Sequence, residues 1–143
     1  MQLRDLYQSM IVDNALHPQH QQALKGSGIK KVYGFNSSCG DQLLLAGRFQ
    51  EQRLQEVSFH AQGCIISRAS ANIMGNLCLR QRSSKIITLI TDFSKLVVGE
   101  SFKDSYELGE AWSLRSVSKL PTRIKCAMLP WETMYRLVKN GVN

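Results

Sequence analysis

Among the side chains of types that bind metal ions, four stand out by their places in the sequence: Cys39, Asp41, Cys64 and Cys126. A single glycine separates Cys39 from Asp41, so little bulk keeps the thiol and the carboxylate away from a shared ion. Zinc and other borderline metals bind thiolates, and a carboxylate adds a harder oxygen ligand. The cysteines are far apart in the sequence, and none of them forms a CxxC pair. On spacing alone, three buried and inert cysteines are the alternative to a metal site.

Predicted strands surround the first of these residues. Residues 31–35 and 42–49 are predicted strands, and the apolar run 43–46 predicts that the second strand is buried on both faces. From residue 56 onward apolar and polar side chains alternate, which is typical of a strand with one buried face. The short connection at residues 50–52 fits a hairpin. Cys39 is therefore expected in a loop between two strands of a small antiparallel sheet.

Helical periodicity places the other two cysteines. The composition of residues 65–78 predicts a helix that begins at or directly after Cys64. The helical spacing of apolar residues over 84–98 predicts another helix, which Gly99 ends. Residues 100–119 predict short helical or irregular pieces. Cys126 lies near the start of a final predicted helix. The stripe of that helix expected to face the core consists of Ile124, Met128, Trp131, Tyr135 and Val138.

A first helix is predicted over residues 2–13. Its apolar residues recur at helical spacing, so one face is expected to be buried, with Leu3, Leu6, Tyr7, Met10 and Ile11 on it. The pair His17-Pro18 ends this helix, because proline disfavours helical geometry in the residue before it. The polar stretch 18–28 is predicted to be a loop.

Composition limits the class of protein. A chain of 143 residues with 43% hydrophobic content can bury one good core, so residues 1–143 are predicted to form a single domain. The net charge of +7 favours acidic partners, but no nucleic-acid motif accompanies it. No apolar run is long enough for a signal peptide or a membrane span, so we expect a cytoplasmic protein. In a reducing cytosol, metal-binding or catalytic thiols are favoured over disulfides.

Three segments of the chain resemble a known family. The segments "SCGDQLLL", "FHAQGCIISRASANIM" and "LPTRIKCAMLPW" each contain one of the three cysteines. In order and surroundings they resemble the three ligand-bearing motifs of the family that includes the NifU N-terminal domain, the IscU scaffolds and the SufU proteins. The resemblance covers most of the chain. It implies an α+β fold in which a small antiparallel sheet packs against helices.

Within that family the chain looks most like the SufU branch. Lys125 stands where IscU-type scaffolds usually have a histidine, and "LGEAWSLRSVSKLPTRIKC" resembles an insertion that SufU proteins carry. The resemblance implies zinc bound by Cys39, Asp41, Cys64 and Cys126. It also implies a zinc-dependent sulfurtransferase that takes persulfide sulfur from a PLP-dependent, SufS-like cysteine desulfurase. Cys39 would accept that sulfur and pass it toward downstream iron–sulfur assembly machinery.

Two alternative functions remain open at this point. One is an IscU-like scaffold on which the same residues hold iron or a [2Fe–2S] cluster. The other is a structural-zinc domain that acts as a basic binding module. Metal analysis separates them, since a scaffold would be brown and contain iron.

Several neighbouring residues receive other predictions. Arg123 and Lys125 flank Cys126 and are candidates for steering the partner or the persulfide, with solvated helix charges as the alternative. Cys78 is predicted to have a packing role, and Trp131 and Tyr135 are predicted to lie in the hydrophobic core. Pro130 is expected to kink the final helix beside Cys126. The three histidines match no ligand position of the family: His17, His20 and His60.

Overall fold

The fold contains one antiparallel sheet and several helices that lie along it. The computed structural model describes residues 2–103 and 105–140. Along the chain the elements are α1 (Leu3–Leu16), β1 (Ile29–Asn36), β2 (Asp41–Gln50), β3 (Arg53–Gln62), α2 (Ile65–Cys78), α3 (Ser83–Leu96), the 3-10 segment η1 (Ser105–Val117) and α4 (Pro121–Asn140). The predicted α+β class with a small antiparallel sheet is confirmed.

The sheet has the strand order β1-β2-β3, with both neighbouring pairs antiparallel. The β1–β2 turn leaves the sheet at the pair Asn36↔Asp41, which places Cys39 in the turn as predicted. The β2–β3 hairpin turns through Glu51 and Gln52, both with positive φ (53° and 64°). Two successive positive φ values match the right-handed twist of the paired strands, so this hairpin forms without an Asn-Gly pair.

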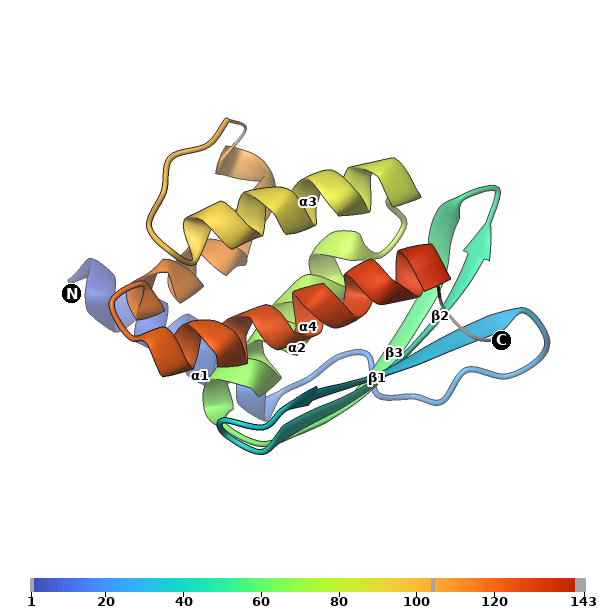
Figure 1. Cartoon of the computed structure of the whole chain (residues 1–143), viewed down its shortest axis with the longest axis horizontal. Coiled ribbons are helices and arrows are strands. Elements are labelled where there is room, and N and C mark those ends of the chain that lie inside the picture. Colours follow the sequence, from blue (N-terminus) through green and yellow to red (C-terminus); the bar gives the residue numbers. More distant parts are fainter. Residues whose placement is uncertain (1, 104, 141–143) are drawn as a thin grey trace.

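Helices cover only one face of the sheet, so the prediction that β2 is buried on both faces was wrong. In Figure 1, α2 and α4 lie along one side of the strands, and the contacts agree: α4 packs on β1 and β2, and α2 packs on β3. Leu43 and Leu45 point to that side and are buried, whereas Leu44 is 45% exposed on the other. Tyr33, which pairs with Leu44 across the strands, is also exposed.

The helical core differs in detail from the predicted stripes. Trp131 of α4 is fully buried and stacks on Phe93 of α3, as expected of a core residue. Tyr135 was predicted to be core, but it is 42% exposed and lies beside Lys139. The buried stripe of α4 instead continues through Met134 and Leu137, because α4 is sandwiched between the sheet and α3.

The first helix buries only its C-terminal half. Ile11 and Ala15 are buried against α2 and η1, the elements that α1 contacts, but Leu3 and Leu6 are exposed. The prediction that the whole apolar face is buried was therefore wrong. The helix ends with His17 as its C-cap, as the pair His17-Pro18 predicted.

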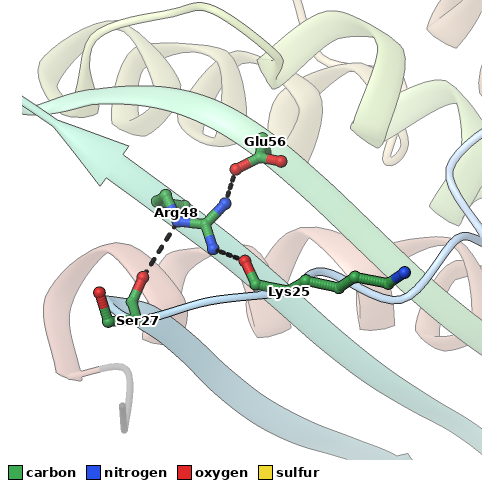
Figure 2. Close-up of polar contacts among 4 residues, drawn as sticks. All are labelled: Lys25, Ser27, Arg48 and Glu56. Carbon is green, nitrogen blue, oxygen red and sulfur yellow. Dashed lines mark hydrogen bonds and ion pairs between the residues drawn. The ribbon is translucent and has the colours of Figure 1, made fainter.

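Residues 17–28, here called the strap segment, connect α1 to β1 without helix or strand. Arg48 of β2 fastens the end of this segment, because its guanidinium contacts the carbonyl oxygens of Lys25 and Ser27 and the carboxylate of Glu56 (Figure 2). The start of the strap segment is held by the backbone N–H of Gln19, which donates to Asn72 Oδ1 at 2.8 Å. The strap segment is thus an ordered part of the fold.

The final helix runs from Pro121 to Asn140 with Pro130 inside it, so Pro130 does not end the helix, and the expected kink beside Cys126 stays a prediction. No helix among the described residues is both long and apolar enough to span a membrane.

Candidate metal centre

The four predicted ligand residues lie at the ends of different elements. Cys39 occupies the exposed β1–β2 turn, and Asp41 is the first, fully buried residue of β2. Cys64 is the N-cap of α2, directly after β3. Cys126 lies one turn into α4 and is fully buried. The predicted position of each of the three cysteines relative to strands and helices is therefore confirmed.

Three of the four residues converge on one point. One ligand atom each from Cys39, Asp41 and Cys126 lies within 4.8 Å of the other two. The two sulfur atoms, Cys39 Sγ and Cys126 Sγ, are 3.1 Å apart, and both cysteines are free. Two sulfurs bound to one tetrahedral zinc at about 2.3 Å would be roughly 3.8 Å apart. A small outward adjustment of the exposed Cys39 would bring the pair to that separation, so the donor set fits a metal ion.

The side chain of Asp41 accepts hydrogen bonds both from the turn before α2 and from the end of β1. Its Oδ1 accepts a hydrogen bond from the backbone N–H of Cys64 at 2.9 Å, and its Oδ2 accepts one from Asn36 Nδ2 at 3.1 Å. Burial raises the pKa of Asp41, but its hydrogen bonds outweigh that effect, so the pKa lies below the ordinary value. Asp41 is therefore held as a carboxylate, the form that binds metals.

Gly63 makes this approach of Asp41 possible. Its φ is +131°, and a Cβ atom on it would lie 2.2 Å from Asp41 Oδ1. Any other residue at this position would displace the carboxylate from the Cys64 N–H. The pair Gly63-Cys64 thus positions one candidate ligand and delivers another.

Cys64 caps a helix, and its sulfur lies outside the group of three. Its Sγ accepts a hydrogen bond from the backbone N–H of Ser67 at 3.5 Å, so the thiol caps the first turn of α2. The sulfur is near enough to Cys126 to raise the pKa of that thiol. Coordination of one ion by all four residues stays a prediction.

Burial is the main cause that raises the pKa of Cys126, and contacts with Cys39 and Asp41 act in the same direction. Without a cation nearby, Cys126 is therefore a neutral thiol at neutral pH. A bound metal ion would supply the positive charge that favours its thiolate.

Two sets of supporting residues were not singled out from the sequence. Asn36 Nδ2, which donates to Asp41, also lies 3.7 Å from Cys126 Sγ. Further inside, Ser70 Oγ donates to the carbonyl oxygen of Ala127 at 2.6 Å and accepts from Trp131 Nε1 at 3.0 Å, which fixes α2 against α4 next to Cys126. The sequence offered one signal for Asn36, which is its position directly after a predicted strand, three residues before Cys39. No sequence pattern indicated a role for Ser70.

The other candidate residues lie outside the group of three. Arg123 and Lys125 are exposed on the first turns of α4, on either side of Cys126 in sequence. Cys78 is fully buried at the far end of α2, and burial raises its pKa, so its predicted packing role is confirmed. No histidine belongs to the one metal-binding group found among the described residues.

Comparison with known proteins identifies the family. The model of the family described as "NifU-like N terminal domain" matches residues 6–127, which is most of the chain. The chain belongs to the NifU-like N-terminal domain family.

Named relatives of this family member include an iron–sulfur cluster assembly scaffold and a zinc-dependent sulfurtransferase. It is 33% identical over 141 residues to the "Iron-sulfur cluster assembly scaffold protein IscU" of Streptococcus pyogenes serotype M1, covering 99% of this chain and 87% of the relative. It is 31% identical over 132 residues to the "Zinc-dependent sulfurtransferase SufU" of Bacillus subtilis, covering 92% and 88%. A crystal structure described as a putative scaffold for the SUF system, from Fervidobacterium islandicum, matches with a TM-score of 0.86 at 27% identity, covering 96% of this chain and all of that one. The predicted kinship with IscU and SufU proteins is confirmed.

Proposed function

We propose that this protein is a zinc-dependent sulfur acceptor in iron–sulfur cluster assembly, and that Cys39 is the residue that receives the sulfur. The observation that carries the proposal is a contrast in exposure within one cluster. Cys39 is exposed, whereas Asp41 and Cys126, whose ligand atoms lie within 4.8 Å of it, are fully buried. Only Cys39 of this group is accessible to a sulfur atom on another protein.

Zinc is the metal we assign to Cys39, Asp41, Cys64 and Cys126. Two thiols and a carboxylate already gathered at one point are a donor set that suits a tetrahedral zinc ion, and the fourth ligand would come from Cys64. When bound, zinc stabilises thiolates at neutral pH and does not itself change oxidation state. The relative from Bacillus subtilis, named a zinc-dependent sulfurtransferase, supports this choice.

The transfer step is a thiolate exchange at sulfur. The donor is the persulfide of a PLP-dependent, SufS-like cysteine desulfurase, written enzyme–S–SH. The Cys39 thiolate attacks its outer sulfur, a new S–S bond forms to Cys39, the old S–S bond breaks, and the enzyme cysteine leaves as a thiolate. The product is Cys39–S–SH, and no external oxidant or reductant is needed. Cys39 would then release that sulfur to the downstream assembly machinery.

The chain's basic surface would assist docking of an acidic partner. Arg123 and Lys125 are exposed beside the cluster, so we assign them the steering of the desulfurase or of the anionic persulfide. We also propose that residues 1–143 act as one domain, because the sequence matched by the family contains all of the proposed ligands.

A scaffold for a [2Fe–2S] cluster is the second candidate function. It is favoured by the relative from Streptococcus pyogenes, which is named a scaffold and aligns over 99% of this chain. Against it stands Lys125, at the position where a histidine is usual in the scaffolds that this chain resembles. Iron and a brown colour in the purified protein would favour the scaffold.

The experiment incubates the full chain with a cysteine desulfurase, PLP and cysteine, and follows both desulfurase turnover and the mass of the chain. We expect faster turnover and a mass gain of one sulfur atom on Cys39. Cys39→Ser should abolish both while its circular dichroism stays unchanged, and Cys78→Ala is the control that should retain both. Sulfur still carried by the Cys39→Ser variant would refute the role of Cys39. Loss of folding in that variant, with no effect of the wild-type chain on the desulfurase, would instead support a structural-zinc module.

A further inference from the structure

The guanidinium of Arg68 is the one charged group of α2, and within the described part of the chain it has no ion-pair partner. Arg68 is one turn beyond Cys64, and its backbone N–H donates to the carbonyl oxygen of Cys64 at 3.2 Å. The side chain is half-buried, and its Nε has neither solvent contact nor a hydrogen-bond acceptor among the described residues. Arg68 belongs to neither of the ion pairs found in that part of the chain.

Arg68 lines a pocket of about 270 Å³ between the end of α1, the strap segment, β3 and α2. The strap segment contributes Pro18 and Gln21, and β3 contributes Phe59 and Ala61. None of the described residues that line this pocket is acidic. The backbone holds its walls in place, because the N–H of Phe59 donates to the carbonyl oxygen of His20 at 2.7 Å. The pocket is therefore a preformed cavity with one cation and no anion.

The Arg68 cation is partly desolvated, at its Nε. A guanidinium removed from water without a paired anion costs free energy, and a buried donor without an acceptor adds to that cost. Native proteins seldom keep such a group without a reason, and an anion taken from outside the chain is the direct way to neutralise it. The guanidinium presents its N–H groups in a planar fork that matches a carboxylate.

We propose that this pocket is a binding site for a carboxylate group, with Arg68 as the charged contact and the Gln21 amide as a neutral hydrogen-bond donor. A single positive charge in the pocket matches the single negative charge of a carboxylate better than a phosphate dianion, which would require a second cation. The carboxylate belongs either to a small free acid or to an acidic side chain of a protein that docks beside Cys64. None of the residues that line this pocket is a proposed metal ligand, so the carboxylate site does not depend on the sulfur chemistry of Cys39.

The test is a titration of the ¹⁵N-labelled full chain followed by NMR, in which the Arg68 Nε–H gives its own signal. Sodium acetate represents a free acid, and glutamate blocked at both backbone ends represents an acidic side chain. Sodium chloride at matched ionic strength is the control. We expect saturable changes in the chemical shifts of the Arg68 Nε–H, the Gln21 side-chain amide and the Ala61 backbone amide with at least one carboxylate. Chloride should not cause them. Tighter binding of acetate assigns a free acid, and tighter binding of the blocked glutamate assigns a side chain.

Variants decide whether the guanidinium is responsible. Arg68→Met keeps the apolar stem and removes the charge, and it should weaken binding about tenfold or more. Arg82→Met, at the exposed start of α3, is the matched control and should leave binding unchanged. Arg68→Lys keeps the charge without the planar fork, so it should bind more weakly than wild type, and it replaces Arg68→Met if that variant fails to fold. Equal shifts with chloride and with both carboxylates, or wild-type affinity in both Arg68 variants, would overturn the proposal.

Discussion

The sulfur atoms of Cys39 and Cys126 lie 3.1 Å apart, although the two residues are 87 positions apart in the sequence. One thiol is exposed in a turn and the other is fully buried in a helix. The contact is made because α4 packs directly on β1 and β2, the two strands that the turn joins. A single ion could therefore be held by a buried part of the fold while one of its ligands stays within reach of another protein.

Replacing Cys64 with serine should separate its two tasks. Serine is a good N-cap, so Cys64→Ser is expected to keep α2 intact, with an unchanged far-ultraviolet circular dichroism spectrum. It offers no thiolate, so the affinity for zinc should fall sharply in a competition titration with a chelator. Ser38→Ala, in the exposed turn, is the control. Wild-type zinc affinity in Cys64→Ser would mean that Cys39, Asp41 and Cys126 suffice.

Asn36 should matter to the metal without touching it. Its side-chain amide lies 3.1 Å from Asp41 Oδ2 and 3.7 Å from Cys126 Sγ, so it orients two candidate ligands. Loss of such supporting contacts commonly weakens metal binding about 10- to 100-fold, and we expect an effect of that size for Asn36→Ala. Asn76→Ala is the matched control, because Asn76 is exposed and bonds His20. Equal zinc affinities of the two variants would show that the Asn36 contact is dispensable.

Ser70 should contribute to stability through the helix pair that carries Cys126. Ser70→Ala removes the acceptor of the buried Trp131 Nε1–H and the donor to Ala127. The unfolding free energy should fall by about 1–3 kcal/mol, measured by urea denaturation. Ser116→Ala removes an exposed hydroxyl that bonds only within its own turn, so its effect should stay within about 0.5 kcal/mol. An unchanged midpoint for Ser70→Ala would contradict this role.

Thiol reactivity should follow burial in the metal-free protein. Cys39 is exposed, whereas burial raises the pKa of both Cys78 and Cys126 and hides them from reagents. With an aromatic disulfide reagent at neutral pH, Cys39 should react first, and Cys78 and Cys126 only after denaturant is added. Peptide mapping of the labelled chain identifies the sites. Labelling of Cys78 at the rate of Cys39 would contradict the structure.

The sequence predicted the elements well because their ends carry local signals. The helix after Cys64 was predicted with its observed bounds, since the change from alternating to helical periodicity coincides with Gly63-Cys64. Exposure was harder to predict. Leu44 and Tyr135 are apolar and fit their local patterns, yet both are exposed, because periodicity does not say which faces neighbouring elements cover. Leu3 and Leu6 were mispredicted for the same reason.

The candidate site was predictable as a set of residues but not as a geometry. The three motifs identified the cysteines and Asp41, and their resemblance to a family provided the common role. The hydrogen bond from Cys64 to Asp41 and the use of the Cys64 sulfur as a helix cap depend on side-chain conformations that no spacing encodes. The unpaired Arg68 was equally hidden, because an arginine on a helix ordinarily reaches solvent.

The measurement that tests the central claim most directly is the metal content of the purified wild-type chain, determined together with its visible absorption spectrum. If Cys39, Asp41, Cys64 and Cys126 bind zinc for sulfur transfer, the colourless protein should contain close to one zinc per chain, and Asp41→Ala should lose it. Iron in place of zinc, with the absorption of a [2Fe–2S] cluster, would contradict the sulfur-acceptor account and favour the scaffold. Zinc retained in full by Asp41→Ala would contradict the proposed ligand set.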